Sequence, residues 1–385
     1  MRVAVVGGNL QGVEACYLAQ KAGWEVVVID KKSSVPASGL CDSIIHSDVT
    51  LESEGARWMK GVDLVIPALE DAQALSCLTQ QTQAADVPFA FDPKAYAVSS
   101  SKVNSNRLFE QIGIPVPEMW PDCGFPVVAK PSNSSGSRGV QVLCSEVDYK
   151  RKEAEAGGFE DWVLQKYVQG ELFSVEVIGS PGEHHAVQIT DLVMDEHYDC
   201  KRVVAPTTMS PELAVEFKRL SILIAGAVEL RGLMDLEVIL QDKDIKVLEV
   251  DARIPSQTPT AVYWSTGLNL VRELARVFLS DSERFQFGMP SPRGAVYEHI
   301  RVSPGLLEVA GEHIMSRVDS LHAVEDFFGA NEAITNYTPG RNNWVATLII
   351  SGTDREDAWG RREEAIRDIR RKFELSTYYD RGPTR

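Results

Sequence analysis

The sequence predicts an α/β protein with a small doubly wound N-terminal domain, a larger central α+β domain and a C-terminal β-rich segment. Three observations lead to this prediction: a strand–glycine turn–helix–strand pattern at the N-terminus, a pair of strongly charged strands at 232–253, and a further β-rich pattern from about residue 290 onward. We expect the domains at 1–95, 96–290 and 291–385, with a smaller lid subdomain at about 120–180 in the central one.

The first domain is predicted from the opening thirty residues, MRVAVVGGNLQGVEACYLAQKAGWEVVVID. A short apolar strand ends in glycines, a helical stripe of apolar residues follows, and a second apolar strand ends at Asp30. The run VDLVIPAL (62–69) is a further strand of the same kind. Nearly continuous apolar strands are typical of a parallel sheet covered on both faces, so a Rossmann-like domain is expected.

Net charge, cysteine spacing and the lengths of apolar stretches favour a protein that binds neither nucleic acid nor membranes. The 385 residues carry a formal net charge of −16, which disfavours binding to a phosphate backbone. The six cysteines show no CxxC pair, which favours reduced thiols in the cytoplasm without structural zinc. The N-terminus is typical of a strand rather than a signal peptide, and no apolar stretch is long enough to cross a bilayer.

The central domain shows a regular order of elements. A serine-rich entry leads into a helix within 99–117, and 126–143 is strand, small-residue loop, strand. Two strands flank Gly170, and an amphipathic helix covers 211–232. The C-terminal segment ends in a charged helix at 355–373, followed by a tail that we expect to be disordered.

The hairpin at 232–253 carries an unusual set of charges. Side chains two apart in a strand share a face, so Glu249, Asp251 and Arg253 point the same way. Asp235 and Glu237 form a matching pair on the partner strand, and paired strands bring such residues roughly 5 Å apart. Crowded carboxylates raise one another's pKa, and a divalent cation removes the conflict. We therefore predict a magnesium site, although a solvated polar face is the alternative.

A magnesium site of this kind implies a nucleotide, and phosphate-binding parts precede it in the chain. The loop 132–139, SNSSGSRG, is built of small residues between two strands, so its backbone N–H groups can hold phosphates. Lys130 ends the apolar strand PVVAK, where a surface lysine is not expected, and Lys102 lies at the other entry. The segment QKYVQGE (165–171) can hold an adenine on its backbone, although an ordinary strand–turn–strand is the alternative.

This order of parts resembles the ATP-grasp superfamily of carboxylate–amine ligases. The resemblance is carried by the lysine before a helix that ends in GIPVP, the strand lysine with its serine and glycine loop, YVQGE, and EVDAR. It covers almost the whole chain. Within the superfamily, GGNLQGVEA, HYDC, MDLE, EVDARIPSQTPT, YWSTGLNL and YEH resemble the ligases that join 3-methylornithine to lysine in pyrrolysine biosynthesis.

The resemblance implies roles for individual residues. Gln165 stands where the superfamily often has glutamate, and Asn9 replaces a lysine of the archaeal-type relatives. The metal ligands would be Glu237, Glu249 and Asp251, and Arg253 and Lys130 would be catalytic. ATP would contact Leu10, Gln11, Asp30, Asp48, Val49, Lys102, Lys130, Ser137, Gly139, Gln165, Lys166, Tyr167, Val168 and Glu171. The amino-acid substrates would contact Asn9, Glu70, Asp71, Glu176, Asp235, Arg253, Ser256, Thr258 and Glu298.

The implied reaction joins the carboxyl group of 3-methyl-D-ornithine to the ε-amine of L-lysine. ATP and Mg²⁺ would drive it through an acyl phosphate, giving ADP and phosphate. The partners would be these small molecules, with no nucleic acid or membrane, and a homodimer is left open. Three alternatives stand beside this reading: another ATP-grasp ligase, a non-catalytic nucleotide-binding module, and a dehydrogenase, for which the middle glycine of GxGxxG is replaced by Asn9.

Overall fold

The computed structural model describes residues 1–51, 55–134, 136, 138–279 and 292–383. The chain forms two compact units, each assembled from separate stretches of sequence. The first unit contains Met1–Phe91, Thr190–Thr207 and Arg253–Arg385, and the second contains Asp92–Ile189 and Thr208–Ala252. The domain boundaries at 95 and 290 inferred from sequence stay a prediction. No helix in the described part of the chain has the length and apolar character needed to span a membrane.

The N-terminal part of the first unit is a parallel four-stranded sheet in the order β3-β2-β1-β4, as the apolar strands predicted. Gly12 lies so close to the turn before α1 that a Cβ there would come within 2.2 Å of the Gly7 carbonyl oxygen. The turn therefore requires glycine to bring α1 onto the sheet. The elements are β1 (Arg2–Val6), α1 (Leu10–Lys21), β2 (Glu25–Asp30), η1 (Pro36–Gly39), β3 (Ser43–His46), α2 (Gly55–Trp58), β4 (Leu64–Pro67) and α3 (Ala72–Ala85).

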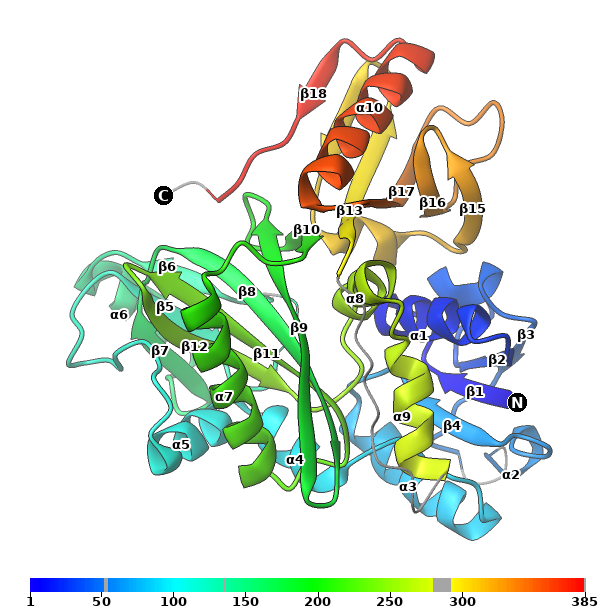
Figure 1. Cartoon of the computed structure of the whole chain (residues 1–385). Coiled ribbons are helices and arrows are strands. Elements are labelled where there is room, and N and C mark those ends of the chain that lie inside the picture. The colour runs from blue at the N-terminus through cyan, green and yellow to red at the C-terminus, as the bar shows by residue number, and fades with distance from the viewer. Residues whose placement is uncertain (52–54, 135, 137, 280–291, 384–385) are drawn as a thin grey trace. The chain divides into compact units, whose positions relative to one another are not determined.

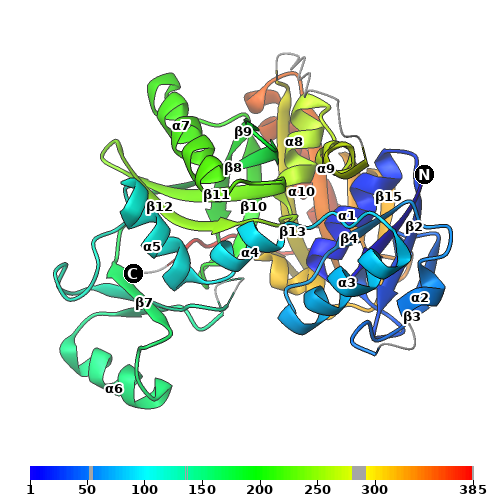
Figure 2. The same cartoon turned by 90° about the horizontal axis from the view of Figure 1, so that it is seen from below.

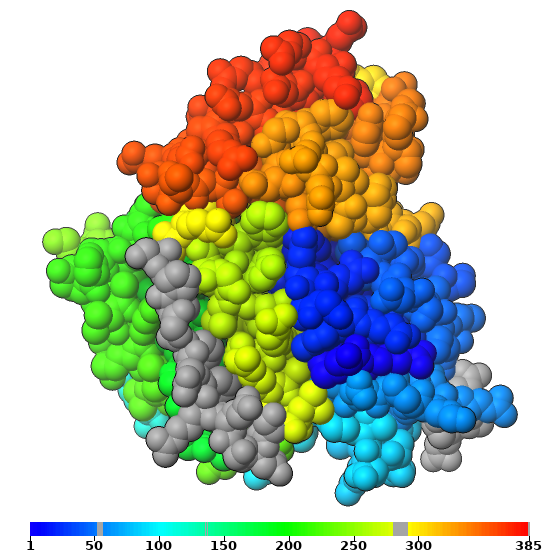
Figure 3. All heavy atoms as spheres, turned by 45° about the vertical axis from the view of Figure 1, so that its right-hand side comes forward, coloured from blue at the N-terminus to red at the C-terminus, as the bar shows by residue number. Residues whose placement is uncertain are grey.

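The C-terminal part of the first unit is antiparallel, with strands in the order β10-β13-β17-β16-β15. Helix α10 lies along β13 and β17 (Figure 1) and buries Ala358, Ala365 and Ile369 on that side. Helix α9 lies against α1, as Figure 3 shows. The elements are β10 (Cys200–Ala205), α8 (Thr258–Thr266), α9 (Leu270–Leu279), β13 (Gly294–Ser303), β14 (Leu306–Val309), η2 (Glu312–Arg317), β15 (His322–Phe327), β16 (Ala330–Thr335), β17 (Trp344–Gly352), α10 (Arg355–Lys372) and β18 (Thr377–Tyr379).

The predicted disorder of the C-terminal tail is wrong. Strand β18 pairs in parallel with β14, and Asp380 beyond it forms ion pairs with Lys201 and Arg202. These partners lie almost two hundred residues away in sequence, so no local pattern announced them. The tail is therefore an integral part of the first unit up to its last described residues.

The second unit is built on strands in the order β12-β11-β8-β9, with α7 packed against β8 and with α4 and α5 against β12 (Figure 2). The same unit has a smaller antiparallel sheet, β6-β5-β7, and helix α6 lies between β6 and β7 in the chain. The sequence reading missed this helix. Strand β9 begins in this unit and continues into the first. The elements are α4 (Pro93–Ser99), α5 (Lys102–Ile112), β5 (Val127–Pro131), β6 (Gln141–Leu143), α6 (Glu146–Ala156), β7 (Trp162–Lys166), β8 (Glu171–Ser180), β9 (Glu183–Met194), α7 (Pro211–Ala227), β11 (Gly232–Gln241) and β12 (Asp244–Asp251).

Candidate functional site

The charged hairpin that the sequence predicted forms between β11 and β12. Asp235 lies opposite Asp251, and Glu237 lies opposite Glu249, so two carboxylate pairs face each other across β11 and β12. The register shifts immediately beyond Glu237, because Val238 pairs with Val247 and Leu248 is the extra residue. This bulge interrupts the regular strand pairing next to the Glu237–Glu249 pair, at the edge of the group of carboxylates. Glu176 on β8 lies opposite Asp235 and is fully buried.

The electrostatics of this hairpin match a site that needs a cation. Burial raises the pKa of Glu237 to about 8, and the neighbouring Glu249 and Asp251 carboxylates add to the rise. The nearby lysines oppose this effect without cancelling it. A carboxylate with so high a pKa lacks sufficient positive charge from the protein itself. Several oxygens close together form the donor set that a hard divalent cation prefers, so the residues present fit Mg²⁺.

Two lysines lie beside these carboxylates. The Lys102 ammonium donates to Glu249 Oε1 at 2.5 Å and to the Ser134 carbonyl oxygen at 2.6 Å, and only 7% of Lys102 is exposed. Burial lowers the pKa of Lys130, whereas Glu249 raises it and Lys102 lowers it further. Both lysines therefore share one electrostatic environment with the candidate metal ligands.

The small-residue loop joins β5 to β6 and is tied to the start of α5. The Lys102 amide donates to the Ser132 carbonyl oxygen at 3.0 Å, and the Ser134 hydroxyl donates to the Arg138 carbonyl oxygen at 3.0 Å. Gly139 has φ of +78°, and a Cβ there would come within 2.8 Å of Pro131. Glycine therefore lets the loop turn tightly over the strand end. Ser137, a predicted ATP contact, lies outside the described residues.

The predicted adenine-binding segment begins at the end of β7. The Gln165 side chain is buried and donates its Nε2 to Asn106 Oδ1 on α5 at 2.8 Å, whereas its Oε1 has no partner in the described part of the chain. The Lys166 and Tyr167 amides donate to backbone oxygens at 2.8 and 3.0 Å. Val168 is partly exposed, and Glu171 is exposed at the start of β8.

Three predicted contacts of the first unit meet at one carboxylate. Glu70 Oε1 accepts from Gln11 Nε2 at 2.7 Å and lies 2.8 Å from Arg253 Nη2. Asn9 and Leu10 precede Gln11 at the start of α1. Chain connectivity places Arg253 two residues after Asp251, which ends β12.

Other predicted contacts of the N-terminal domain already have partners within the protein. Asp71 caps α3 by accepting from the Ala74 amide at 2.8 Å. Asp30 accepts from the Gly8 amide at 2.8 Å and therefore holds the glycine turn before α1. Hydrogen bonds from Thr50 lower the pKa of Asp48, and the buried Val49 accepts from Gln81. Each residue thus has a local structural role beside the role expected from resemblance.

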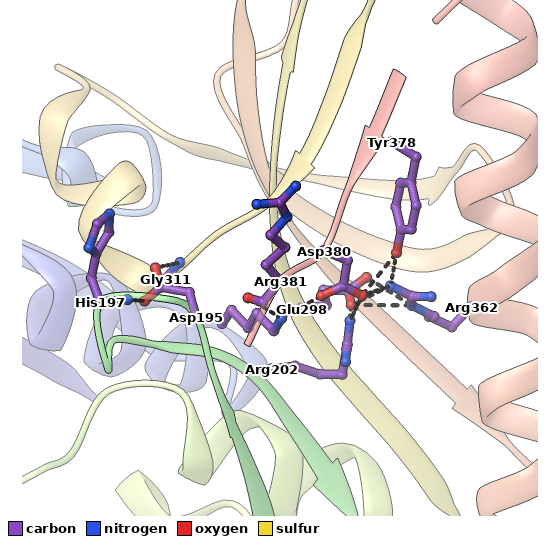
Figure 4. Close-up of polar contacts among 10 residues, drawn as sticks. Asp195, His197, Arg202, Glu298, Gly311, Arg362, Tyr378, Asp380 and Arg381 are labelled. Carbon is purple, nitrogen blue, oxygen red and sulfur yellow. Dashed lines mark hydrogen bonds and ion pairs between the residues drawn. The ribbon is translucent and has the colours of Figure 1, made fainter. Parts of the chain in front are cut away.

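Glu298 lies in a buried ion-pair cluster of the first unit (Figure 4). Its Oε1 accepts from Arg202 and, at 2.7 Å, from Arg362, and the glutamate has no exposed surface. Asp380 joins the cluster at 2.7 Å from Arg202 Nη2, and Tyr378 accepts from Arg362 at 2.8 Å. A substrate could contact the Glu298 carboxylate directly only if one of these arginines gave up its hydrogen bond to a carboxylate oxygen.

Sequence reasoning named Ser256 and Thr258 but missed two residues beside them, Gln257 and Glu312. Gln257 is 5% exposed and has φ of +76° at the N-cap of α8. The side chains of Ser256 and Gln257 both interact with the Glu312 carboxylate. The signal for Gln257 was its place between two predicted contacts, whereas Glu312 follows a glycine in an unremarkable stretch, VAGEHIM.

The structure thus gathers the predicted site residues into two groups. The second unit holds the candidate metal ligands, the two lysines, the loop and the predicted adenine-binding segment. The first unit holds the Gln11–Glu70–Arg253 contact and the residues near the start of α8. Glu298 belongs to the first unit but to a separate set of ion pairs.

Comparison with known proteins finds relatives that cover almost the whole chain. A family model described as an ATP-grasp domain matches residues 99–257. The chain is 34% identical to the 3-methyl-D-ornithine–L-lysine ligase of Methanosarcina mazei over 96% of each chain. It is 33% identical to the ligase of the same description from Methanosarcina barkeri, over 96% of this chain and 98% of that one.

Solved structures show the same fold at lower identity. The biotin carboxylase domain of Hydrogenobacter thermophilus 2-oxoglutarate carboxylase, solved as a dimer with MgADP, ADP and bicarbonate, aligns with a TM-score of 0.72 and 16% identity. The alignment covers 95% of this chain and 89% of that one. At this identity the likeness establishes the fold, and it confirms the α/β prediction with its parallel N-terminal sheet.

Proposed function

Because this chain belongs to the ATP-grasp family of ATP-dependent carboxylate–amine ligases, we propose that it joins the carboxylate of (3R)-3-methyl-D-ornithine to the ε-amine of L-lysine. The products are 3-methylornithyl-N6-lysine, ADP and phosphate, in a step of pyrrolysine biosynthesis. The observation that carries the proposal is the 34% identity over 96% of each chain to a ligase of that description. Family membership leaves no support for the dehydrogenase alternative.

ATP binds, in this proposal, to the second unit. Lys102, Lys130 and the amides of the loop after β5 hold its phosphates, and the segment from Gln165 to Val168 holds the adenine. Glu237, Glu249 and Asp251 hold Mg²⁺, which supplies positive charge against the phosphate oxygens. The raised pKa of Glu237 supports this role, because it indicates a carboxylate that lacks a sufficient counter-charge.

The chemistry requires activation of a carboxylate. A carboxylate oxygen of the D-amino acid attacks the γ-phosphorus of ATP, ADP leaves, and an acyl phosphate forms. The neutral ε-amine of lysine then attacks the acyl carbon, phosphate leaves with the carbon–oxygen bond electrons, and the amine gives up a proton. The protein contributes position and charge in both steps.

Arg253 supplies positive charge for the acyl substrate in this scheme, with Ser256 and Thr258 following it in the chain. Its Nη2 lies 2.8 Å from Glu70 Oε1, and this ion pair fixes one edge of the guanidinium. The acidic Glu70 and Asp71 suit substrates that carry ammonium groups. Water must be kept from the acyl phosphate, and we propose that the loop after β5 closes over it.

The direct test is product analysis. The protein is incubated with ATP, Mg²⁺, 3-methyl-D-ornithine or D-ornithine, and L-lysine, and the products are examined by mass spectrometry. We expect a dipeptide linked through the lysine side chain, with one ADP per bond formed and with oxygen-18 from the D-amino acid's carboxylate in the released phosphate. An α-linked dipeptide, or ADP formation that depends on other amino acids, would instead assign the chain to a different ligase reaction.

A further inference from the structure

The segment between Arg253 and α8 contains a residue in a backbone conformation that L side chains rarely adopt. Gln257 has φ of +76° and ψ of −58° while 95% of it is buried, and it is not a glycine. Its Nε2 donates to the Cys200 carbonyl oxygen at 3.4 Å. Strained positions of this kind persist where the surrounding structure holds them, and they concentrate in binding sites.

Two hydrogen-bond acceptors at this point have no partner in the described part of the chain. They are Oε1 of Gln257 and Oε2 of Glu312, and both atoms are shielded from solvent. The Ser256 and Gln257 side chains stabilise the Glu312 carboxylate, so the two residues are neighbours. An unsatisfied buried acceptor is costly, so two such oxygens on neighbouring residues indicate that a donor group from outside the chain belongs here.

Hydrogen bonds hold the backbone of the two residues that flank Glu312 in the chain. The Gly311 amide donates to Asp195 Oδ2 at 2.9 Å (Figure 4), and the His313 amide donates to Asp199 Oδ2 at 3.0 Å. A Cβ on Gly311 would come within 2.3 Å of the Asp199 carboxylate. Glu312 is therefore held in place between two clamped neighbours.

The charge at this position calls for a cation. Burial raises the pKa of Glu312, and the Asp199 carboxylate raises it further, whereas Ser256, Gln257 and Arg253 only lower it. Arg253 directs its Nη2 to Glu70 at 2.8 Å. A group that satisfies a carboxylate oxygen and an amide oxygen at once must offer at least two donors, and an alkylammonium offers these together with the positive charge that the carboxylate lacks.

We propose that Gln257 and Glu312 form an ammonium-binding subsite for one of the diamino acid substrates. The inference rests on the proposed ligase function. Three ammonium groups are eligible: the α and δ groups of the ornithine and the α group of lysine. The ε-amine of lysine is excluded because it reacts as the neutral amine.

The test compares each substrate with an analogue that lacks one ammonium group. D-norvaline lacks the δ group of D-ornithine, 5-aminopentanoate lacks its α group, and 6-aminohexanoate lacks the α group of lysine. For the wild-type enzyme we expect each analogue to lower kcat/KM, measured by ADP release. In Glu312→Gln, we expect the penalty for one analogue to shrink at least tenfold while the other two persist, because only the matching ammonium has lost its partner.

Glu325→Gln serves as the matched control, because Glu325 is an exposed glutamate on β15 of the same unit. It should keep all three wild-type penalties. Unchanged penalties in Glu312→Gln would overturn the subsite and leave an ordered water as the partner of the two oxygens.

Calorimetry separates this inference from the reaction itself. D-ornithine and L-lysine are titrated into the wild type and Glu312→Gln, and the affinity for one of them should fall at least tenfold in the variant. If the wild type binds both amino acids but makes no ligated product, the proposed reaction fails while the subsite is still measured. Equal affinities in the two proteins would contradict the subsite.

Gln257→Gly provides a second variant that does not depend on Glu312. Glycine adopts positive φ without strain, which offsets part of the stability that is lost with the buried side chain. The KM for the same substrate should rise because an acceptor is lost. A lower unfolding temperature with an unchanged KM would show that Gln257 has only a structural role.

Discussion

Glu249 has one positively charged neighbour and one negatively charged neighbour in this structure. It pairs with Lys102 at 2.5 Å and lies opposite Glu237 on the adjacent strand. Glu249→Gln keeps the shape of the side chain but replaces an anionic ligand with a neutral one. We expect the variant to fold with an unfolding temperature close to that of the wild type and to lose nearly all ligase turnover, measured as ADP release.

Asp244→Asn is a suitable control for that experiment, because Asp244 is an exposed carboxylate at the start of the same strand. It should retain full activity. Substantial turnover in Glu249→Gln would remove Glu249 from the proposed metal ligands.

Lys130 pays a desolvation cost that a surface lysine avoids, since burial lowers its pKa. A bound phosphate would compensate for that cost. Lys130→Ala should weaken ATP binding by roughly 1.5–3 kcal/mol, as expected for loss of a charge-assisted hydrogen bond, measured by calorimetry. Lys150→Ala, which removes an exposed lysine paired with Glu146 on α6, should leave the affinity unchanged. Equal affinities for both variants would make Lys130 a structural lysine.

His299 is fully enclosed on β13 and bonds to Thr347 at 2.8 Å. Burial and the nearby His313 lower its pKa to about 3, below the ordinary value of 6.5. Between those two values the unfolded chain binds a proton that the folded protein does not, so stability falls as the pH falls from 6.5 toward 3. At pH 5 the loss relative to pH 7 is about 2 kcal/mol from this residue.

The measurement is urea unfolding at pH 7 and pH 5 for the wild type and for His299→Gln. The glutamine can keep the bond to Thr347 but does not titrate, so the variant should lose less stability on acidification. An identical pH dependence in the two proteins would mean that His299 is protonated in the folded state.

Strand β18 and the residue that follows it attach the chain end to β10 and α10. Burial works against ionisation of Asp380, but Arg202 and Lys201 outweigh it and lower the pKa to about 2. The stabilisation is therefore complete above pH 3.8 and is lost as the pH falls toward 2. Asp380→Asn should lower the free energy of unfolding by roughly 1–3 kcal/mol at pH 7, because buried donors lose their charged partner.

Hydrogen exchange is the measurement that locates this effect. Amides of residues 377–380 should exchange faster in Asp380→Asn, while those of α7 in the other unit stay protected. Unaltered exchange in β18 would show that pairing with β14 alone holds the tail.

The charged hairpin was predictable and the C-terminal tail was not, for a physical reason. Carboxylates at every second position, followed by a short turn, define both the pairing of β11 with β12 and the face that they share. Two partners of Asp380, Lys201 and Arg202, lie nearly 180 residues earlier in the chain, and contacts so distant in sequence leave no local pattern. Gln257 was missed because side-chain identity alone does not reveal a positive φ.

Helix α6 shows a different reason for failure. It has a serine N-cap that accepts from Asp148 and ends at Gly157, but none of its residues is fully buried. Without an apolar stripe, the helix was hidden from a reading based on hydrophobic periodicity. The capping residues were the available signal.

The two units of the chain share the strand β9, and the stretch Thr190–Thr207 belongs to the first unit although the second surrounds it in sequence. Strand β10 within that stretch pairs with β13 and buries Val203, Val204 and Ala205. A gene fragment encoding residues 92–252 would therefore carry β10 paired with β9 on one side but without β13 on the other, which leaves an apolar strand edge exposed. Recombination that moves only the codons for residues 92–252 into another gene would therefore separate β10 from its partner strand. The exchanged segment would also have to include β13, which is encoded more than forty codons downstream.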